Sequence, residues 1–303
     1  MLSRTGLARV LGPRLAGGRE LSPGARALLW MAASGALFSL LNALLRGMSL
    51  RMSPFQTLTL VYASTLSVIL PLALRGGAAR FRPRQPVGLL VRGVVHWVGM
   101  CLWLVAVSGI TLAETTAIGF TTPLFIMVGA ALLLKEPLRW ERAVATVAGF
   151  GGVLVVVSPR LTSVGGGHSL MMLGSAAVFA ASFLLSKRLT RHDAPLVIVF
   201  WQSVIVTLFS LPLAWAYWSS PTAADLWTAL LCGLLTAIGN YCLTRAFVSA
   251  DISASQPAKF LDLVWACLLG WLMFGDLPDG ATLTGGFVIL IATMWVARRE
   301  AGR

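Results

Sequence analysis

The chain has 303 residues, of which 57% are hydrophobic and only 12% are charged, and its mean hydropathy is +0.82. A soluble domain carries about 25% charged residues, so this composition excludes an ordinary soluble protein and indicates an integral membrane protein. The formal net charge of +13 would suit nucleic-acid binding, but the positions of the basic residues along the chain favour a membrane topology instead, and no nucleic-acid partner is expected.

The first 26 residues are polar and rich in arginine. They lack the continuous apolar core of a secretory signal, so a short cytoplasmic tail is the simpler interpretation. A mitochondrial presequence is the alternative, although glycine and proline interrupt any long amphipathic helix in this segment.

Ten apolar runs follow, each of roughly the 20 residues that cross a bilayer core as an α-helix. A β-barrel would need shorter segments of alternating polarity, whereas stretches such as LFIMVGAALLL are apolar on every face. The sequence therefore predicts an all-α integral membrane protein with ten transmembrane helices. Their expected limits are 27–46, 54–74, 87–107, 110–134, 143–158, 168–186, 195–218, 225–247, 252–274 and 281–297.

The basic residues between these runs are unevenly divided. With the amino terminus in the cytoplasm, the loops that hold Arg75 to Arg84, Lys135 to Arg142 and Lys187 to Arg191 all lie inside, and Arg46, Arg51 and Arg160 lie outside. Cytoplasmic loops carry the excess of lysine and arginine. We therefore expect a multi-pass protein of the cell (inner) membrane with both termini cytoplasmic.

The chain repeats itself after 141 residues. This shift brings Phe38 onto Phe179, Pro54 onto Pro195 and Cys101 onto Cys242, and a one-residue deletion then brings Phe120 onto Phe260. Each unit holds five spans, and an odd number forces the second unit to enter from the opposite side. The two repeats are therefore expected to be inverted, the symmetry that secondary transporters use to expose a midplane site to either side in turn.

The segments LAETTAIGFTTPLFIMVGAALLLKEPLRWERAVATVAGFGGVLVVV and ASQPAKFLDLVWACLLGWLMFGDLPDGATLTGGFVILIATMWV resemble the paired domains of the EamA family of the drug/metabolite transporter superfamily. The resemblance implies a central cavity lined by the first, third and fourth helices of each repeat. It also implies a substrate among amino acids, their derivatives, riboflavin, nucleotide-like metabolites or drugs. We expect the first repeat over 27–158, a linker over 159–167, the second repeat over 168–297, and tails over 1–26 and 298–303.

Two opposite charges stand within the ninth run, Lys259 and Asp262. Their spacing of three residues places both on one helical face, and charges at this depth generally face a bundle interior or a water-filled path. Either they contact the substrate, with Asp262 as an additional candidate for proton coupling, or they form a structural ion pair that pins two helices together.

Four further residues are candidate substrate ligands: His96 and Trp97 in the third run, Asn42 in the first and Asn240 in the eighth. The unperturbed pKa of histidine, about 6.5, suits proton coupling, and a tryptophan can stack a planar ligand. Three of them also have a structural interpretation, namely a hydrogen-bonded packing residue for His96, a packing or interfacial residue for Trp97 and an interhelical hydrogen bond for Asn42.

Other polar residues are expected to have mainly structural or gating roles. Arg92 and Arg245 lie toward the cytoplasmic ends of their helices, where a long side chain can reach water, and Tyr241 lies one turn from Arg245. Glu114 suits the positive end of its helix dipole. Glu136 and Asp276 lie at equivalent positions after the fourth and ninth runs, where capping or loop fixation is expected.

No metal site, cofactor or ATP-hydrolysing motif is expected, because the four cysteines lack metal-ligand spacing and no GxxxxGK[ST] sequence is present. We expect a secondary transporter that moves a small organic metabolite by alternating access and is not an enzyme. Amino acids and related amphipathic compounds are the first expectation, and larger aromatic metabolites such as riboflavin or adenosyl compounds are the alternative. An intramembrane enzyme and a passive channel are the rival classes. Protons as coupling ion and a homodimer remain open.

Overall fold

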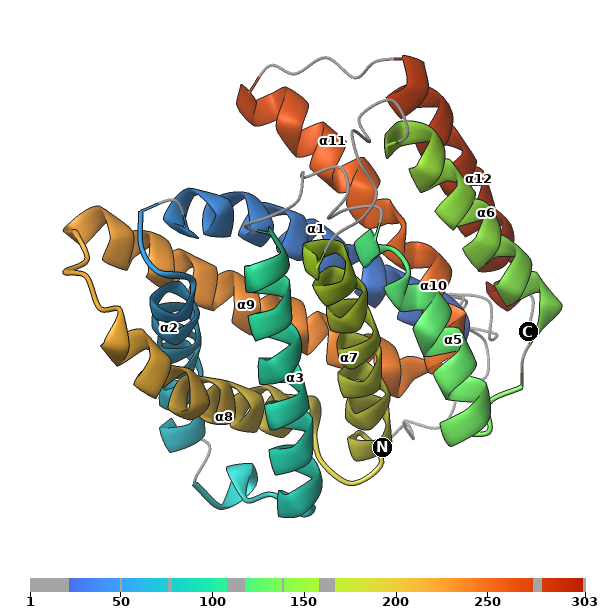
Figure 1. The fold of residues 1–303 in the computed structure, drawn as a ribbon. Coiled ribbons are helices and arrows are strands. Elements are labelled where there is room, and N and C mark those ends of the chain that lie inside the picture. Colours follow the sequence, from blue (N-terminus) through green and yellow to red (C-terminus); the bar gives the residue numbers. More distant parts are fainter. Residues whose placement is uncertain are drawn as a thin grey trace, which may run out of the picture.

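The computed structural model describes residues 22–49, 51–75, 78–107, 118–137, 139–157, 167–274 and 280–301. Every regular element in these ranges is a helix (Figure 1). The α-helices are α1 (Pro23–Ser49), α2 (Pro54–Arg75), α3 (Pro86–Val107), α5 (Thr122–Leu133), α6 (Trp140–Val157), α7 (Gly167–Leu189), α8 (Pro195–Ala216), α9 (Ala223–Ser249), α10 (Ile252–Lys259), α11 (Leu261–Phe274) and α12 (Gly280–Ala301), and a short 3-10 helix, η2 (Ala78–Phe81), precedes α3.

The predicted membrane fold is confirmed. Each of the ten expected spans contains at least one described helix. Five described segments are long and apolar enough to cross a membrane by themselves, and shorter apolar helices accompany them. The five are Pro23–Leu45, Pro86–Val107, Gly167–Leu189, Pro195–Ala216 and Ala223–Ser249.

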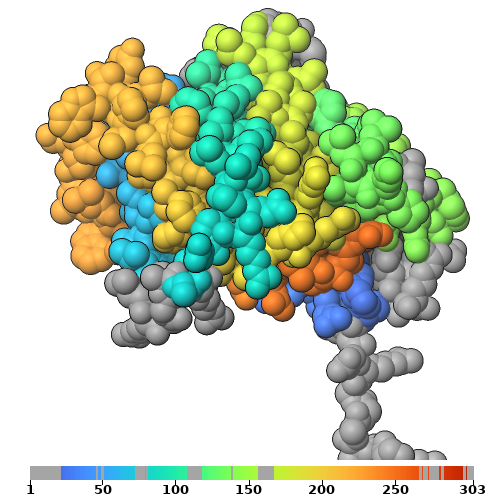
Figure 2. Space-filling view, turned by 90° about the horizontal axis from the view of Figure 1, so that it is seen from below, coloured from blue at the N-terminus to red at the C-terminus, as the bar shows by residue number. Residues whose placement is uncertain are grey.

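The helix contacts follow a pseudo-twofold symmetry that pairs the first repeat with the second. The packing of α1 on α9 is matched by that of α7 on α3, and the packing of α2 on α9 by that of α8 on α3. Equivalent helices also pack directly on each other, α2 on α8 and α6 on α12. Figure 2 shows α3 and α7 side by side, with α8 and the start of α9 on one flank and α5 and α6 on the other. The two repeats therefore interlock.

The ninth span is not the continuous helix that the sequence suggested. It divides at Phe260 into α10 and α11. Proline lacks an N–H and disturbs the helix around it, and α10 contains Pro257. The carbonyl of Pro257 accepts from the Phe260 N–H at 3.4 Å and from the Thr293 hydroxyl of α12 at 3.3 Å, so the hydrogen bonds tighten here and the regular α-helical pattern is interrupted.

The equivalent position of the first repeat, Phe120, also interrupts a helical segment. Residues 120 and 121 form a turn before α5 begins at Thr122, and the N–H of Thr121 donates to the Ile118 carbonyl at 2.9 Å. Both spans are therefore interrupted at the same point of the repeat, although Thr121 and Phe260 keep α-helical dihedral angles.

Candidate functional site

Lys259 and Asp262 form an ion pair beside the interruption of the ninth span. The Lys259 Nζ lies 2.5 Å from Asp262 Oδ2, and the two side chains are 23% and 19% exposed. The expectation that the two residues share one face and neutralise each other is confirmed. Because few charges are tolerated at such depth without a function, the pair marks the first candidate site.

Helix α1 provides the surface opposite this pair. The ring of Phe38 lies beneath the Lys259 ammonium, 5.5 Å from Nζ to the ring centroid, and Ser39 Oγ donates to the backbone carbonyl of Asp262 at 3.2 Å. Gly35 permits the close approach, since a Cβ at this position would lie 2.0 Å from Asp262 Oδ1. Any larger residue at position 35 would displace the carboxylate.

A small cavity of about 10 Å³ borders Lys259, room for about one water molecule. It lies where α1, α5, α7, α9 and α10 meet, so both repeats contribute to it. Its walls are mostly apolar and include two phenylalanine rings. They are Met31, Thr122, Pro123, Ile126, Phe183, Leu243, Phe247, Gln256 and Lys259.

Two polar atoms beside the ion pair, Asp262 Oδ1 and Trp265 Nε1, are buried and have no hydrogen-bond partner among the residues that the structure describes. Trp265 lies one helical turn after Asp262 on α11. A buried polar group that makes no hydrogen bond costs about 1–3 kcal/mol. The site therefore holds one free acceptor and one free donor.

A second polar cluster joins α2, α3, α7 and α8. His96 is buried and hydrogen-bonds through Nε2 to the Tyr62 hydroxyl at 3.0 Å and through Nδ1 to Ser182 Oγ at 3.4 Å. Its ring also lies 5.4 Å from that of Phe179, which stacks on the cavity-lining Phe183 at 6.2 Å. His96 is therefore connected through Phe179 to Phe183, which lines the cavity.

Arg92 does not reach water as expected. Its side chain is 1% exposed, and it donates from Nη1 to Gln202 Oε1 of α8. Gln202 Nε2 lies 3.5 Å from the Tyr62 hydroxyl. The sequence could not show this arrangement, because the partner of Arg92 lies on a helix 110 residues away.

The remaining substrate-ligand candidates, Asn42, Trp97 and Asn240, differ in their exposure and in their contacts. Asn42 is exposed and lies on the face of α1 that carries Gly35 and Ser39. Trp97 packs on Phe209 of α8, with ring centroids 5.7 Å apart. Asn240 is buried and donates to the Thr236 carbonyl of its own helix at 3.0 Å.

Tyr241 and Arg245 both contact Trp30 of α1. The Tyr241 ring meets the Trp30 ring edge to face at 6.4 Å, and the Arg245 guanidinium lies 5.6 Å from the Trp30 centroid. Arg245 is half-buried rather than fully extended into water. Glu114 and Asp276 lie outside the described residues.

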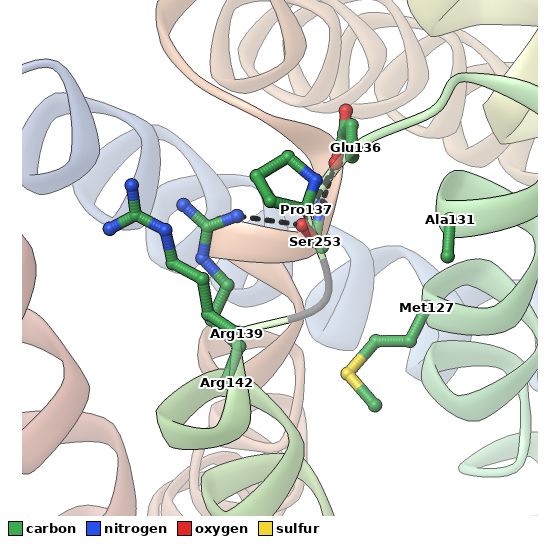
Figure 3. A pocket seen from close by; sticks show the side chains of 7 residues that line it. All are labelled: Met127, Ala131, Glu136, Pro137, Arg139, Arg142 and Ser253. Atoms are coloured by element: carbon green, nitrogen blue, oxygen red, sulfur yellow. Dashed lines mark hydrogen bonds between the residues drawn. The ribbon is translucent and has the colours of Figure 1, made fainter.

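A third cluster links the two repeats at one end of the bundle. We call this end the basic end, because the loops holding Lys135 to Arg142 and Lys187 to Arg191 lie there. Glu136 accepts from the N–H of Ile252 at 2.9 Å and from the N–H and hydroxyl of Ser253 at 3.1 and 2.8 Å (Figure 3). The expected capping role of Glu136 is found, but the capped helix is α10 of the other repeat.

Arg142 and Lys187 extend this cluster. Arg142 Nη1 donates to Asp251 Oδ2 at 3.1 Å and to Ser253 Oγ at 2.9 Å, and Figure 3 shows Arg142 and Glu136 reaching Ser253 from two directions. Lys187 Nζ donates to the carbonyls of Phe247 and Ala250, each at 2.5 Å. These bonds hold α5, α6 and α7 against the junction of α9 and α10. Within the described part of the chain, no three histidine, cysteine, aspartate or glutamate side chains gather as metal ligands.

Inverted repeats, interrupted helices and a half-buried ion pair beside one interruption define a secondary transporter of metabolites, not an enzyme. The family model of the EamA-like transporter family matches residues 25–158 and 168–298. The chain belongs to this family and carries two EamA domains.

Several characterised transporters are similar to the chain over almost its whole length. A riboflavin transporter of Rhizobium johnstonii is 35% identical over 282 residues, covering 91% of this chain and 92% of that protein. A riboflavin transporter of Vibrio cholerae is 31% identical, covering 90% and 93%, and an S-adenosylmethionine uptake transporter of Rickettsia prowazekii is 25% identical, covering 90% and 92%. A solved crystal structure shares the fold, with a TM-score of 0.78 at 20% identity over 91% of this chain and 98% of that chain.

Proposed function

We propose that the protein transports riboflavin or a closely related flavin across the membrane by alternating access. The observation that carries this proposal is the combination of aromatic walls with a compact polar group. Phe38 lies beside the ammonium of Lys259, which pairs with Asp262, and Phe183 and Phe247 line the small cavity together with Lys259. A flat heteroaromatic ring system with one polar edge matches such a surface, since aromatic rings favour stacking or edge contacts with other rings.

The similarity to the two riboflavin transporters supports this proposal over the first expectation from sequence, which ranked amino acids highest. That ranking depended on the two signs of charge at Lys259 and Asp262. The ion pair satisfies both charges internally, so neither ion demands a charged partner from the substrate, and a neutral flavin is compatible with the site.

An adenosyl compound is the second candidate. S-adenosylmethionine carries a carboxylate, an ammonium, a cationic sulfonium and an aromatic base, and separation of Lys259 from Asp262 would provide a cation for the carboxylate and an anion for one of the two cationic groups. The similarity to the S-adenosylmethionine uptake transporter favours this candidate, at lower identity than that to the riboflavin transporters.

Uptake into proteoliposomes tests the proposal. Purified protein is reconstituted, preloaded with unlabelled riboflavin and given labelled riboflavin outside. We expect saturable counterflow that excess riboflavin abolishes and that excess amino acids leave intact. If S-adenosylmethionine or an amino acid shows counterflow and riboflavin shows none, the proposed substrate is wrong and the transported compound takes its place. Flux that rises linearly with concentration and shows no counterflow would indicate a passive channel.

We also propose that the basic end faces the cytoplasm, following the charge rule. The links from Glu136, Arg142 and Lys187 to the second repeat then close the cytoplasmic side in this conformation. Proton coupling through His96 or Asp262, and assembly as a homodimer, remain predictions. A pH gradient imposed on the same proteoliposomes tests the coupling, because a proton-coupled carrier accumulates riboflavin against its gradient.

A further inference from the structure

Three hydrogen-bonding side chains follow one another along the ninth span at intervals of three residues: Lys259, Asp262 and Trp265. Phe260, between the first two, has α-helical dihedral angles, so this interval keeps successive side chains on neighbouring positions of one helical face, about 4.5 Å apart along the axis. In order, they offer a donor, an acceptor and a donor. Lys259 is the last residue of α10 and the other two lie on α11; we call this set the α11 ladder.

The ladder is only partly satisfied within the protein. Lys259 pairs with Asp262 Oδ2, whereas Asp262 Oδ1 and Trp265 Nε1 are buried and have no hydrogen-bond partner in the described part of the chain. Both free groups lie against the same point of α1. A Cβ on Gly35 would lie 2.0 Å from Asp262 Oδ1 and 3.5 Å from Trp265 Cδ1, the ring atom bonded to Nε1.

Unsatisfied polar atoms in a membrane interior are costly, and here they occur in the wall of the proposed transport path. Helix α1 covers them in this conformation, with Ser39 bonded to the Asp262 carbonyl. Separation of α1 from α11 would expose the whole ladder to the path. A substrate that bonds to the free atoms then gains from groups that the empty protein leaves unpaired.

We propose that the α11 ladder binds the imide edge of the flavin ring, and this inference rests on the proposed function. That edge presents a carbonyl, an N–H and a second carbonyl in sequence, which is the complement of donor, acceptor and donor. Lys259 donates to one carbonyl, Asp262 Oδ1 accepts from the ring N–H, and Trp265 Nε1 donates to the other carbonyl.

The same ladder discriminates against the adenosyl alternative. The pairing edge of adenine presents one amino donor and one ring acceptor, so it leaves at least one member of the ladder without a partner. A site that hydrogen-bonds its substrate rejects analogues that leave its buried polar groups unpaired. The ladder therefore determines specificity as well as affinity.

Methylation of the flavin N–H tests the central contact. Riboflavin and 3-methylriboflavin are compared as competitors of labelled riboflavin in counterflow. We expect the methyl compound to compete at least about tenfold more weakly with the wild-type protein, because a buried hydrogen bond to a charged group is lost. In Asp262→Ala the difference between the two compounds should fall below about threefold, since the effects of removing either partner do not add.

Two further variants keep the test decisive. Asp262→Ala leaves Lys259 without its partner, so Lys259→Met/Asp262→Ala serves as an electrically neutral version, and retained monodispersity in size-exclusion chromatography establishes folding. Trp265→Phe should weaken both flavins by a similar factor. The matched control is Trp215→Phe on α8, whose side chain is 80% exposed, and it should weaken neither.

The possible results separate the two proposals. If riboflavin shows no counterflow with the wild-type protein, the proposed function fails. If riboflavin is transported but 3-methylriboflavin competes equally well, the function stands and the ladder is overturned. The ladder is also overturned if methylation weakens competition equally in the wild type and in Lys259→Met/Asp262→Ala, because the methyl group would then clash at another part of the protein.

Discussion

Phe120 and Phe260 stack on each other with ring centroids 5.5 Å apart and ring planes at 23°. The two residues hold equivalent positions in the two repeats, and each marks the interruption of its span. Residues related by a twofold axis can touch each other only near that axis. The stack therefore marks where the pseudo-twofold axis passes through the bundle, and relative movement of the two interrupted spans must alter this contact.

The fit around the Phe260 ring predicts the effect of Gly149→Ala. A Cβ at this position would lie 2.5 Å from the ring, so the ring or α6 must shift, at a cost of about 1–3 kcal/mol for an overpacked core. We expect a lower midpoint of thermal unfolding and slower counterflow. Gly151→Ala in the same helix meets no atom within 4 Å and should leave both unchanged or raise stability slightly. Equal behaviour of the two variants would contradict the packing.

Gly35→Ala tests the contact between α1 and the ion pair. The added methyl group would lie 2.0 Å from Asp262 Oδ1, so α1 can no longer close over α11 as it does here. We expect counterflow at least about tenfold slower, with a modest loss of thermal stability. Gly47→Ala, also in α1, meets no atom within 4 Å and serves as control. Normal transport by Gly35→Ala would show that this closed arrangement is not part of the cycle.

Gln202→Leu removes the hydrogen-bond acceptor of Arg92. The guanidinium would stay buried without its acceptor, and breaking one partner of a buried charged contact costs about 3–5 kcal/mol. We expect a large fall in folded protein, measured by fluorescence-detected size-exclusion chromatography during heating. Arg92→Met/Gln202→Leu should recover most of the loss, because neither polar group remains. No recovery in the double variant would mean that Gln202 acts mainly through Tyr62.

Glu136→Gln weakens the link between the repeats at the basic end. A glutamine has one side-chain oxygen, so it cannot accept all three hydrogen bonds that Glu136 receives from Ile252 and Ser253. We expect a loss of about 1 kcal/mol of helix capping. We also expect at least threefold faster maleimide labelling of Ala131→Cys, a residue of the adjoining pocket, in a background without the native cysteines.

Asp193→Asn is the control for Glu136→Gln. Asp193 also receives backbone N–H groups, those of Arg84 and Gln85, at 2.8 and 3.3 Å, but these precede α3, so its loss breaks no bond between α5 and α10. Labelling at position 131 should not change in this variant. Similar acceleration by both variants would indicate general loosening of the protein rather than opening between the repeats.

The sequence predicted the membrane fold, the ten spans and the inverted repeat because each depends on hydrophobic length or on internal similarity. The pairing of Lys259 with Asp262 was predictable for a similar reason, since three residues along one helix determine their relation. Contacts between different helices were not predictable from the sequence. Arg92 bonds to Gln202 and Glu136 caps α10, and no local pattern joins residues more than 100 positions apart.

The interruption at Phe260 could be predicted only in part. Pro257 within the run was a visible sign of a disturbed helix. The place of the turn, however, depends on the Thr293 hydroxyl of α12, which takes up the Pro257 carbonyl. The free atoms of Asp262 and Trp265 were likewise hidden, because their lack of partners is a property of the packed structure and not of the residue types.

The positions equivalent to Lys259 and Asp262 in the first repeat are occupied by Gly119 and Thr122. A chain made of two copies of one unit has thus kept its architecture in both halves and its ionic chemistry in only one. If the proposed site at Lys259 and Asp262 is correct, substitutions in the second half would alter which cargo is accepted while the first half preserves the mechanical partner. Duplication in this way allows a transporter lineage to diversify its substrates without redesigning the motion that carries them.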